Sequence, residues 1–291
     1  MSWRIVVISQ RAKLELKLNY MVIRGETETK VFIDEISMLI IENTAVSLTC
    51  ALLQTLTERK VKVVFCDTKR NPSSELVSLY GSHDTSSRIR NQIKWETDFK
   101  RLVWMEIVKE KIRKQAFLLG KLALGEAQLL YGYIEQVEPG DPTNREGHAA
   151  KVYFNALWGK SFSRAQDNFT NAALNYGYAM ILSVFNREIV ANGYLTQLGL
   201  FHDNMFNFFN LSSDMMEPFR PLIDMQVYYL PQFDEFSKDE KFQLLEVLNQ
   251  TVYIDSSIQY VTNAIKIYCK SILDALEAQD ISLIKFYNNE F

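Results

Sequence analysis

The sequence predicts an α+β fold in which a small N-terminal β-rich domain with one helix precedes a larger all-α domain. Up to about residue 75 the chain alternates short segments of β-branched residues with polar or glycine turns, whereas further on apolar residues recur at helical spacing. Residues 68–87 differ from both and hold turn-forming Asn-Pro, Ser-Ser and Gly-Ser pairs. We therefore expect an N-terminal domain over residues 1–75, a linker over 68–87 and a helical domain over 88–291.

In the N-terminal domain, each expected strand is a short run rich in strand-forming residues that ends at a polar or glycine turn. Residues 46–59 differ, because Leu48, Leu52 and Leu56 recur at the four-residue spacing of one helical face. This segment is the predicted helix. The expected strands are residues 4–9, 12–18, 20–25, 29–34, 37–41 and 60–67.

In the C-terminal domain, helices are predicted where apolar residues recur at intervals of three and four. The sequence there contains no internal repeat and no low-complexity tract. The expected helices lie near residues 88–114, 116–131, 146–158, 163–191, 216–229, 238–249 and 253–279.

The composition is that of a globular protein with a substantial core, with 47% hydrophobic and 23% charged residues. The longest apolar runs, such as residues 5–8 and 38–41, are far shorter than the ~18 residues that a membrane span requires. Because the N-terminus lacks the apolar segment of a secretory signal, we expect a cytoplasmic protein. The sequence has no Gly-rich phosphate loop, G-x-S-x-G elbow or H-E-x-x-H helix, so it gives no support to nucleophilic catalysis by Ser or Cys.

The net charge of −3 conceals an uneven distribution. Residues 88–114 hold nine basic side chains against four acidic ones, whereas from Asp203 to the end fourteen acids face six bases. A basic run is either a solvated helix face or a strip that binds nucleic acid, because local potential governs such contacts more than net charge does. The acidic C-terminal part argues against a protein that coats DNA indiscriminately.

Glu146 heads the apolar stripe of the helix predicted over residues 146–158, where a charged side chain is unexpected. One interpretation is a capping box, in which Thr143 is the N-cap and Glu146 reaches back to its backbone N–H. The alternative is that Glu146 lies in a polar pocket with a cation, because an unpaired buried carboxylate is costly. Local sequence leaves both interpretations open.

His202 and three later carboxylates form a second candidate group. Asp214, Glu217 and Asp224 are spaced so that they fall close to one helical face. A histidine among apolar residues is commonly a hydrogen-bonded core residue, and acids in a first helical turn are favoured by the helix dipole. A histidine with carboxylates from separate helices is also the donor set that Mg²⁺ or Mn²⁺ accepts. Spacing alone does not bring Glu146 to this group.

Taken together, four segments resemble the CRISPR-associated integrase-endonuclease family of spacer acquisition. They are "NREGHAAKVYF", "NAALNYGYAMILS", "LGLFHDN" and "FNLSSDMMEPFRPLID". The N-terminal half contains similar recurring segments, and the resemblance runs from residue 3 to residue 230. In detail the chain is most similar to the subtype that accompanies a single-protein RNA-guided nuclease.

The resemblance implies an N-terminal β-sandwich-like domain that largely mediates dimerisation and a helical domain that holds the active site. It implies that Glu146, His202 and Glu217 bind the catalytic metal ion, Mg²⁺ or Mn²⁺. Many relatives have aspartate where this chain has Glu217, and Asp214 is the competing candidate for that position.

The implied reaction is a transesterification, in which a 3′-hydroxyl of a prespacer attacks a phosphodiester at the leader–repeat junction. The implied partners are double-stranded prespacer DNA, CRISPR repeat DNA, a second copy of the chain in a homodimer, and a small ferredoxin-like CRISPR-associated protein whose dimer bridges two such homodimers. The alternatives are a metal-dependent nuclease that cuts branched or single-stranded DNA, and a non-catalytic DNA-binding scaffold. We expect eight basic residues to hold the phosphate backbone: Arg88, Arg90, Lys109, Lys111, Arg113, Lys114, Arg145 and Lys151.

Overall fold

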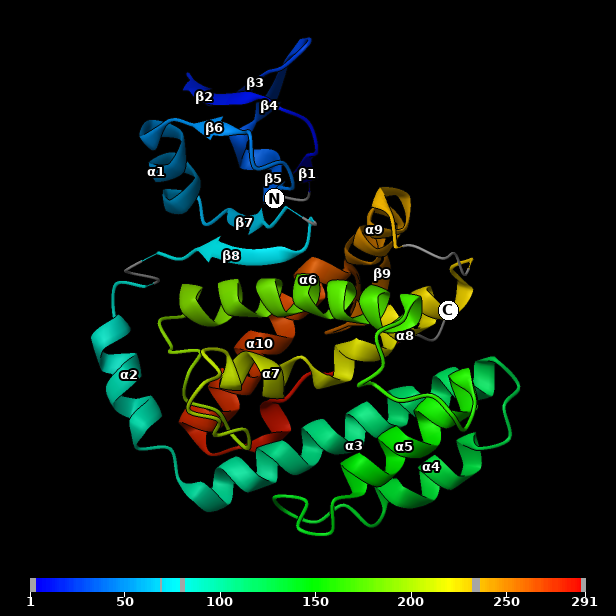
Figure 1. Ribbon diagram of the computed structural model, residues 1–291. Helices are drawn as coiled ribbons and strands as arrows, with labels where there is room; N and C mark the ends of the chain where they lie inside the picture. Colours follow the sequence, from blue (N-terminus) through cyan, green and yellow to red (C-terminus); the bar gives the residue numbers. More distant parts are fainter. Residues whose placement is uncertain (1–3, 69, 79–81, 232–235, 289–291) are drawn as a thin grey trace. The chain divides into compact units, whose positions relative to one another are not determined.

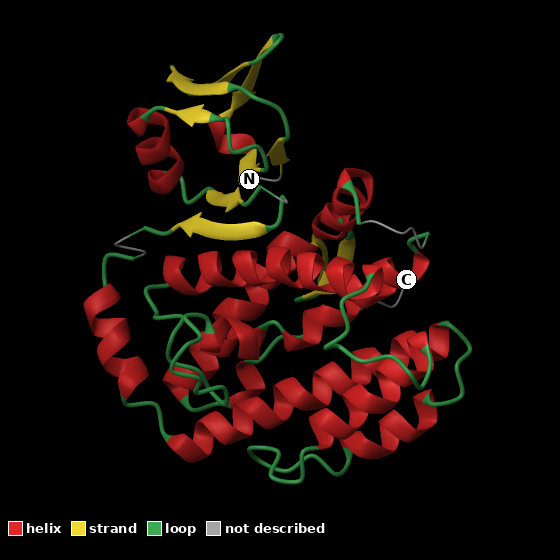
Figure 2. Cartoon of the chain, in the orientation of Figure 1, coloured by secondary structure: helices red, strands yellow, loops and turns green. Residues whose placement is uncertain are grey.

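The computed structural model describes residues 4–68, 70–78, 82–231 and 236–288. The chain divides into two compact units, Met1–His83 and Asp84–Phe291 (Figure 1). Most of the described strands belong to the first unit and most of the helices to the second (Figure 2). The predicted α+β class is therefore confirmed.

The first unit contains two four-stranded sheets. In the first sheet, of order β1-β5-β7-β8, the first three strands run parallel and β8 is antiparallel: β1 (Arg4–Ile8), β5 (Ile36–Ile41), β7 (Lys62–Cys66) and β8 (Pro72–Leu76). In the second, of order β4-β3-β2-β6, three antiparallel strands are joined by a short parallel one: β4 (Glu28–Phe32), β3 (Tyr20–Arg24), β2 (Lys13–Lys17) and β6 (Ser47–Leu48).

One hydrophobic core joins the two sheets and helix α1 (Cys50–Glu58). Leu39 of the first sheet, Leu14 of the second and Leu52 of the helix are all fully buried in it. Thr49 caps the helix by accepting a hydrogen bond from the backbone N–H of Leu52. Two sheets that share a core form the predicted β-sandwich-like unit, with its single α-helix.

The predicted linker over residues 68–87 contains ordered structure at both ends. Its first half includes β8, which pairs with β7 at the edge of the first sheet, and its second half includes the start of α2 (Thr85–Ile93). The sequence does not predict this strand, because it is polar and begins with Pro72, a pattern that is typical of a loop. An edge strand can have this composition, since it needs few apolar residues. The boundary between the two units falls between His83 and Asp84.

The second unit is built around α6 (Phe169–Ala191), most of whose residues are buried. None of the helices in the described ranges is both long and apolar enough to cross a membrane. The remaining elements are α3 (Thr97–Lys121), α4 (Ala127–Ile134), α5 (Arg145–Trp158), α7 (Asn210–Met215), η2 (Glu217–Phe219), α8 (Arg220–Tyr229), α9 (Lys238–Leu245), η3 (Glu246–Asn249), β9 (Thr251–Ile254), β10 (Ser257–Tyr260), α10 (Val261–Ala278) and η4 (Ile281–Leu283).

The helix predicted over residues 88–114 is two helices, α2 and α3, separated at Lys94–Glu96. Tertiary contacts fix this break. The Gln92 side chain donates to the carbonyl oxygen of Leu195, 2.8 Å away, and accepts from its N–H, while the Trp95 ring packs on Tyr194. Such long-range contacts leave no periodic signal in the local sequence.

The second unit is not wholly helical, because the segment predicted as a helix from residue 253 begins with a hairpin. Strands β9 and β10 pair through a two-residue turn in which Asp255 and Ser256 have φ values of 50° and 60°. Paired positive φ values match the turn to the right-handed twist of a hairpin. Only the part from Val261 onward, α10, is helical.

Candidate functional site

Helix α5 places Glu146 in its first turn, but not as a capping residue. The N-cap is Asn144, in left-handed conformation, whose side chain accepts from the N–H of Gly147. Asp141 accepts from the N–H groups of Arg145 and Glu146, at 2.8 and 2.9 Å. The capping box with Thr143 is therefore wrong, because other side chains already satisfy the early N–H groups. The carboxylate of Glu146 is left for another partner.

That partner is Lys111, in the middle of α3. Its Nζ lies 2.6 Å from Oε1 of Glu146 and 2.5 Å from Oε2 of Glu217. Lys111 is 8% exposed and Glu217 only 3%. The structure thus brings two of the predicted metal-binding residues, from α5 and η2, to one buried ammonium group.

Arg220, at the start of α8, supplies a second cation. Its Nε lies 3.0 Å from the other oxygen of Glu217, Oε1. Burial opposes ionisation of Glu217, yet Arg220 and Lys111 together hold its pKa below the usual value. Burial would lower the pKa of Lys111, but Glu217 and Glu146 outweigh it and raise that pKa. Both glutamates are therefore matched by positive charge within the protein.

His202 lies in the loop between α6 and α7 and is held by Asp214. Its Nδ1 is 2.5 Å from Oδ1 of Asp214, and within the described residues Nε2 makes no hydrogen bond. The hydrogen bond to Asp214 raises the pKa of His202, to which the charges of Glu217 and Glu146 also contribute. The side chain is 39% exposed, so His202 is not a core residue.

Asp214 is fully buried, and its carboxylate accepts hydrogen bonds from the backbone of the loop. Its Oδ2 accepts from the N–H groups of Leu200 and Phe201, at 2.6 and 3.1 Å, and its Oδ1 accepts from the N–H of His202 at 3.2 Å. With the His202 ring added, both oxygens are engaged. Of the two candidates for the third predicted ligand, Asp214 therefore has its oxygens engaged by hydrogen bonds, whereas Glu217 faces side-chain cations.

No three His, Cys, Asp or Glu side chains in the described ranges are grouped so that they surround an ion as they stand. The Lys111 ammonium group occupies the position between the carboxylates of Glu146 and Glu217. Two of the three predicted ligands, Glu146 and Glu217, are therefore neighbours, and their carboxylates are arranged around a side-chain cation.

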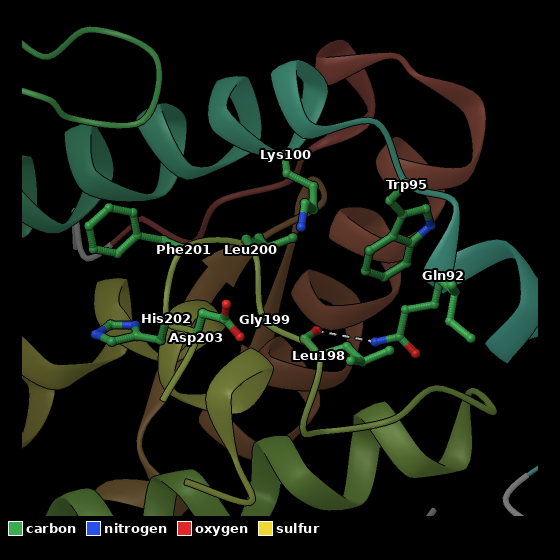
Figure 3. Close-up of a pocket in the computed structure, with 10 residues that line it drawn as sticks. Gln92, Trp95, Lys100, Leu198, Gly199, Leu200, Phe201, His202 and Asp203 are labelled. Carbon is green, nitrogen blue, oxygen red and sulfur yellow. Dashed lines mark hydrogen bonds between the residues drawn. The ribbon is translucent and has the colours of Figure 1, made fainter. Parts of the chain in front are cut away.

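A pocket opens beside His202 (Figure 3). It lies between Trp95 of the α2–α3 junction, Lys100 in the first turn of α3, and the loop that carries His202 and Asp203. The loop also exposes Phe201, whose ring stacks on Trp104 with centroids 4.7 Å apart. The lining of this pocket includes His202 but neither Glu146 nor Glu217.

The basic strip predicted over residues 88–114 is not one solvated face. Lys111 and Lys114 are buried, and Lys114 pairs with Glu110 at 3.0 Å and donates to the carbonyl oxygen of Tyr287. The structure argues against the predicted DNA-binding role of these two lysines. A phosphate group cannot reach a buried ammonium group without displacing the partner that the ammonium already has.

The other six predicted DNA-binding residues differ in their surroundings. Lys109 and Arg113 pair with Glu106 and Glu110, three positions earlier on the same helix. Arg88 pairs with Asp84 and donates to the hydroxyl of Tyr194, and the Arg145 guanidinium lies 5.8 Å from the Tyr133 ring centre. The residues exposed to solvent are Arg90, Arg113 and Lys151.

Asp224, which the sequence grouped with Glu217, belongs to a separate cluster. The hydroxyl of Tyr153 donates to its Oδ2 at 2.8 Å, and the hydroxyl of Tyr178 donates to its Oδ1. Burial raises the pKa of Asp224 from 3.8 to about 6, although both hydrogen bonds lower it. Sequence reasoning missed this cluster and the roles of Lys111 and Arg220, because its members come from helices far apart in the chain.

Residues 5–254 match the protein family described as CRISPR associated protein Cas1. The chain is 33% identical over 262 residues to the CRISPR-associated endonuclease Cas1 of Neisseria meningitidis serogroup C, covering 89% of this chain and 86% of that protein. It is 23% identical to the CRISPR-associated endonuclease Cas1 1 of Francisella tularensis subsp. novicida, over 89% of both proteins. The chain belongs to the Cas1 family of CRISPR-associated proteins, and its similarity to the Neisseria protein agrees with the subtype that accompanies a single-protein nuclease.

Solved structures show the same fold. A Cas1 protein from Thermotoga maritima matches 99% of this chain and all of its own at a TM-score of 0.73 and 18% identity. A casposase bound to its integration product matches with a TM-score of 0.77 and 14% identity, covering 97% of this chain and 92% of its own. In a Cas6-RT-Cas1–Cas2 complex, the matched region is 36% of a longer chain, with a TM-score of 0.76 and 16% identity.

Proposed function

We propose that this Cas1 protein is a metal-dependent DNA integrase-endonuclease that joins the 3′-hydroxyl of a prespacer to a phosphodiester at the leader–repeat junction of a CRISPR array. The observation that carries the proposal is the convergence of Glu146 and Glu217, from different elements, on one cation position. His202, held by Asp214, lies within electrostatic reach of both carboxylates.

The side chains fit a divalent cation of the Mg²⁺ or Mn²⁺ type. Two carboxylates and one imidazole are donors that such ions accept. Both oxygens of the buried Glu217 carboxylate already face cations, Oε2 the Lys111 ammonium at 2.5 Å and Oε1 the Arg220 guanidinium at 3.0 Å. Positive charge is therefore favourable at this position, and an added cation would take the place of Lys111. Glu146, Glu217 and Nε2 of His202 would hold the ion, which supplies Lewis-acid activation of the phosphodiester.

The protein's own residues account for the rest of the site. The bond from Nδ1 of His202 to Asp214 fixes the ring orientation, as hydrogen-bonded carboxylates commonly do for histidine ligands. Glu146 and Glu217 provide negative charge on rigid helical elements, so the phosphate and the 3′-hydroxyl meet a prearranged site. Exposed basic residues such as Lys151, five residues after Glu146 on α5, would contact the DNA backbone.

The proposed partners follow from the resemblance and from the related structures. One similar structure is part of a Cas6-RT-Cas1–Cas2 complex, and another is a casposase bound to its integration product. These two relatives support assembly with a second CRISPR-associated protein and DNA as substrate. We propose a homodimer, two copies of which are bridged by a small ferredoxin-like partner dimer. The DNA would be a double-stranded prespacer and the CRISPR repeat.

The test is a strand-transfer assay with the protein, its CRISPR-associated partner, labelled prespacer DNA and a supercoiled plasmid that carries the repeat. We expect label to join the plasmid with Mn²⁺ or Mg²⁺, to stay free with chelator, and to join again when the metal is restored. His202→Ala should abolish joining while leaving prespacer binding and the melting temperature nearly unchanged. Full activity in chelator, or in His202→Ala, would contradict the proposed site.

The same assay separates the second candidate function, cutting without joining. The curated relatives are named endonucleases, and hydrolysis needs the same ligands with water in place of the 3′-hydroxyl. Metal-dependent nicking of the plasmid without transfer of the label would favour the nuclease over the integrase.

A further inference from the structure

Lys111 is an unexpected residue at its position in the fold. Its neighbours on α3, Ile107, Val108 and Ile112, are fully buried, and the lysine is 8% exposed. A buried ammonium group is costly unless it is paired and hydrogen-bonded. Here the partners are Glu146 and Glu217, which come from two other elements and make no hydrogen bond to each other.

Among the four charged side chains in direct contact, the formal charges balance without any ion. Glu146 and Glu217 contribute two negative charges, and Lys111 and Arg220 contribute two positive ones. A divalent cation that binds both carboxylates must therefore compete with a resident cation for the same oxygen atoms. The balance also removes the repulsion that two buried carboxylates would otherwise feel.

We propose that Lys111 is a positioning residue that holds Glu146 and Glu217 together before the metal ion binds and limits the affinity of that ion by competing with it. This inference rests on the proposed metal site. It reassigns a residue that the sequence grouped with DNA-binding lysines, because its ammonium group faces the carboxylates inside the protein.

The neighbouring Lys114 provides a matched control. It lies on the same helix and is equally buried, but its partners are Glu110 and the backbone carbonyl of Tyr287, neither of which is a proposed ligand. Removing this ammonium should cost stability without changing the metal site.

The experiment measures Mn²⁺ affinity by calorimetry and melting temperature without metal, on the full-length chain. Lys111→Met should lower the metal-free melting temperature by roughly 5 °C or more and raise Mn²⁺ affinity by at least about tenfold. Lys114→Met should also melt lower but should bind Mn²⁺ within about twofold of wild type. Unchanged or weaker Mn²⁺ binding by Lys111→Met would overturn the inference.

A double variant covers the case in which Lys111→Met does not fold. In Lys111→Met combined with Glu146→Gln, one carboxylate is lost together with the ammonium, so charge balance with Arg220 returns and the protein should fold. Failure of the double variant as well would show that Lys111 is needed for packing, and would overturn the proposal.

The two proposals fail differently. If the wild type binds no Mn²⁺ but Lys111→Met does, the competition is supported directly. If neither binds Mn²⁺, the metal site and this inference are both wrong. If the wild type binds Mn²⁺ and Lys111→Met binds it no more tightly, only the inference is wrong.

Discussion

Glu217 and Asp224 are two carboxylates in neighbouring elements of the second unit, one in η2 and the other in α8, and both are almost completely buried. Glu217 contacts the cations Lys111 and Arg220. Asp224 instead accepts hydrogen bonds from two tyrosine hydroxyls. Burial raises the pKa of Asp224 to about 6, whereas for Glu217 the cations overcome burial and lower the pKa.

The partner, and not the depth of burial, decides what each carboxylate can do. A carboxylate matched by cations stays ionised and can exchange one cation for another, which is what a metal ligand requires. Hydrogen bonds from hydroxyl groups stabilise the ionised carboxylate less than paired cations do, so burial keeps the pKa of Asp224 raised. The same hydrogen bonds join helices, because Tyr153 of α5 and Tyr178 of α6 meet on Asp224 of α8. Four predictions test this contrast.

The largest expected difference is in catalysis. Glu217→Gln removes a full negative charge from the proposed ion's ligands, so strand transfer should fall by at least about a thousandfold (~4 kcal/mol). Asp224→Asn removes a charge that the ion does not touch, so activity should stay within about tenfold of wild type. Rates are measured in the same assay at saturating Mn²⁺. Equal losses in the two variants would break the distinction between the clusters.

The second prediction concerns pH. The pKa of Asp224 is raised on folding, so the folded state holds a proton that the unfolded state releases, and the stabilisation present below pH 3.8 is lost as pH rises through about 6. In Asp224→Asn this loss is absent. The free energy of unfolding of the variant minus that of wild type should therefore increase between pH 4.5 and 7, by about 2 kcal/mol.

Urea denaturation at pH 4.5, 5.5 and 7.0 measures this difference. The variant is also expected to be less stable at every pH, because one tyrosine hydroxyl then faces an amide NH₂ group that cannot accept its hydrogen bond. The test therefore uses the change of the difference with pH and not its absolute value. A difference that stays constant over this range would mean that Asp224 does not hold its proton in the folded protein.

The third prediction concerns Asp214, which links the His202 ring to the loop backbone. Asp214→Asn should lower Mn²⁺ affinity by about 10- to 100-fold, because the ring loses its charged hydrogen-bond partner. It should also destabilise the fold by about 1–3 kcal/mol, because the new NH₂ group meets backbone N–H donors. The control is Asp203→Asn, an exposed neighbour. Equal Mn²⁺ affinity in both variants would exclude an orienting role for Asp214.

The smallest expected effect extends the contrast to basic residues. Lys151 is exposed, whereas the charge of Lys114 is matched inside the protein. Lys151→Ala should weaken duplex DNA binding a few-fold and reduce the slope of log affinity against log salt by ~0.9, the value for one phosphate contact. Lys114→Ala should leave the slope unchanged. A slope that changes with Lys114 and not with Lys151 would reverse the assignment.

Sequence patterns predict the strands of the first unit from their composition. Family motifs group Glu146, His202 and Glu217, and the structure brings the first and last of these to one ammonium group. The stripe Ala149, Tyr153 and Leu157 on α5 is buried as its spacing predicts.

The errors arose where long-range partners decide the outcome. The motif Thr143-x-x-Glu146 satisfies a capping box locally, but Asn144 and Asp141 occupy that role in the folded chain. Lys111 is one of several basic residues in a helical segment. Its role differs from theirs because Glu146 and Glu217 lie beside its ammonium group in the folded chain. Charge patterning along a single segment contains no information about such partners.

The most direct measurement is the anomalous diffraction of Mn²⁺ in crystals of the wild-type protein. The account predicts one strong peak roughly 2.0–2.3 Å from an oxygen of Glu146, an oxygen of Glu217 and Nε2 of His202, with the Lys111 ammonium moved away from at least one carboxylate. A Mn²⁺ peak that lies elsewhere, or no peak while Lys111 still bridges the two glutamates at saturating Mn²⁺, would contradict it.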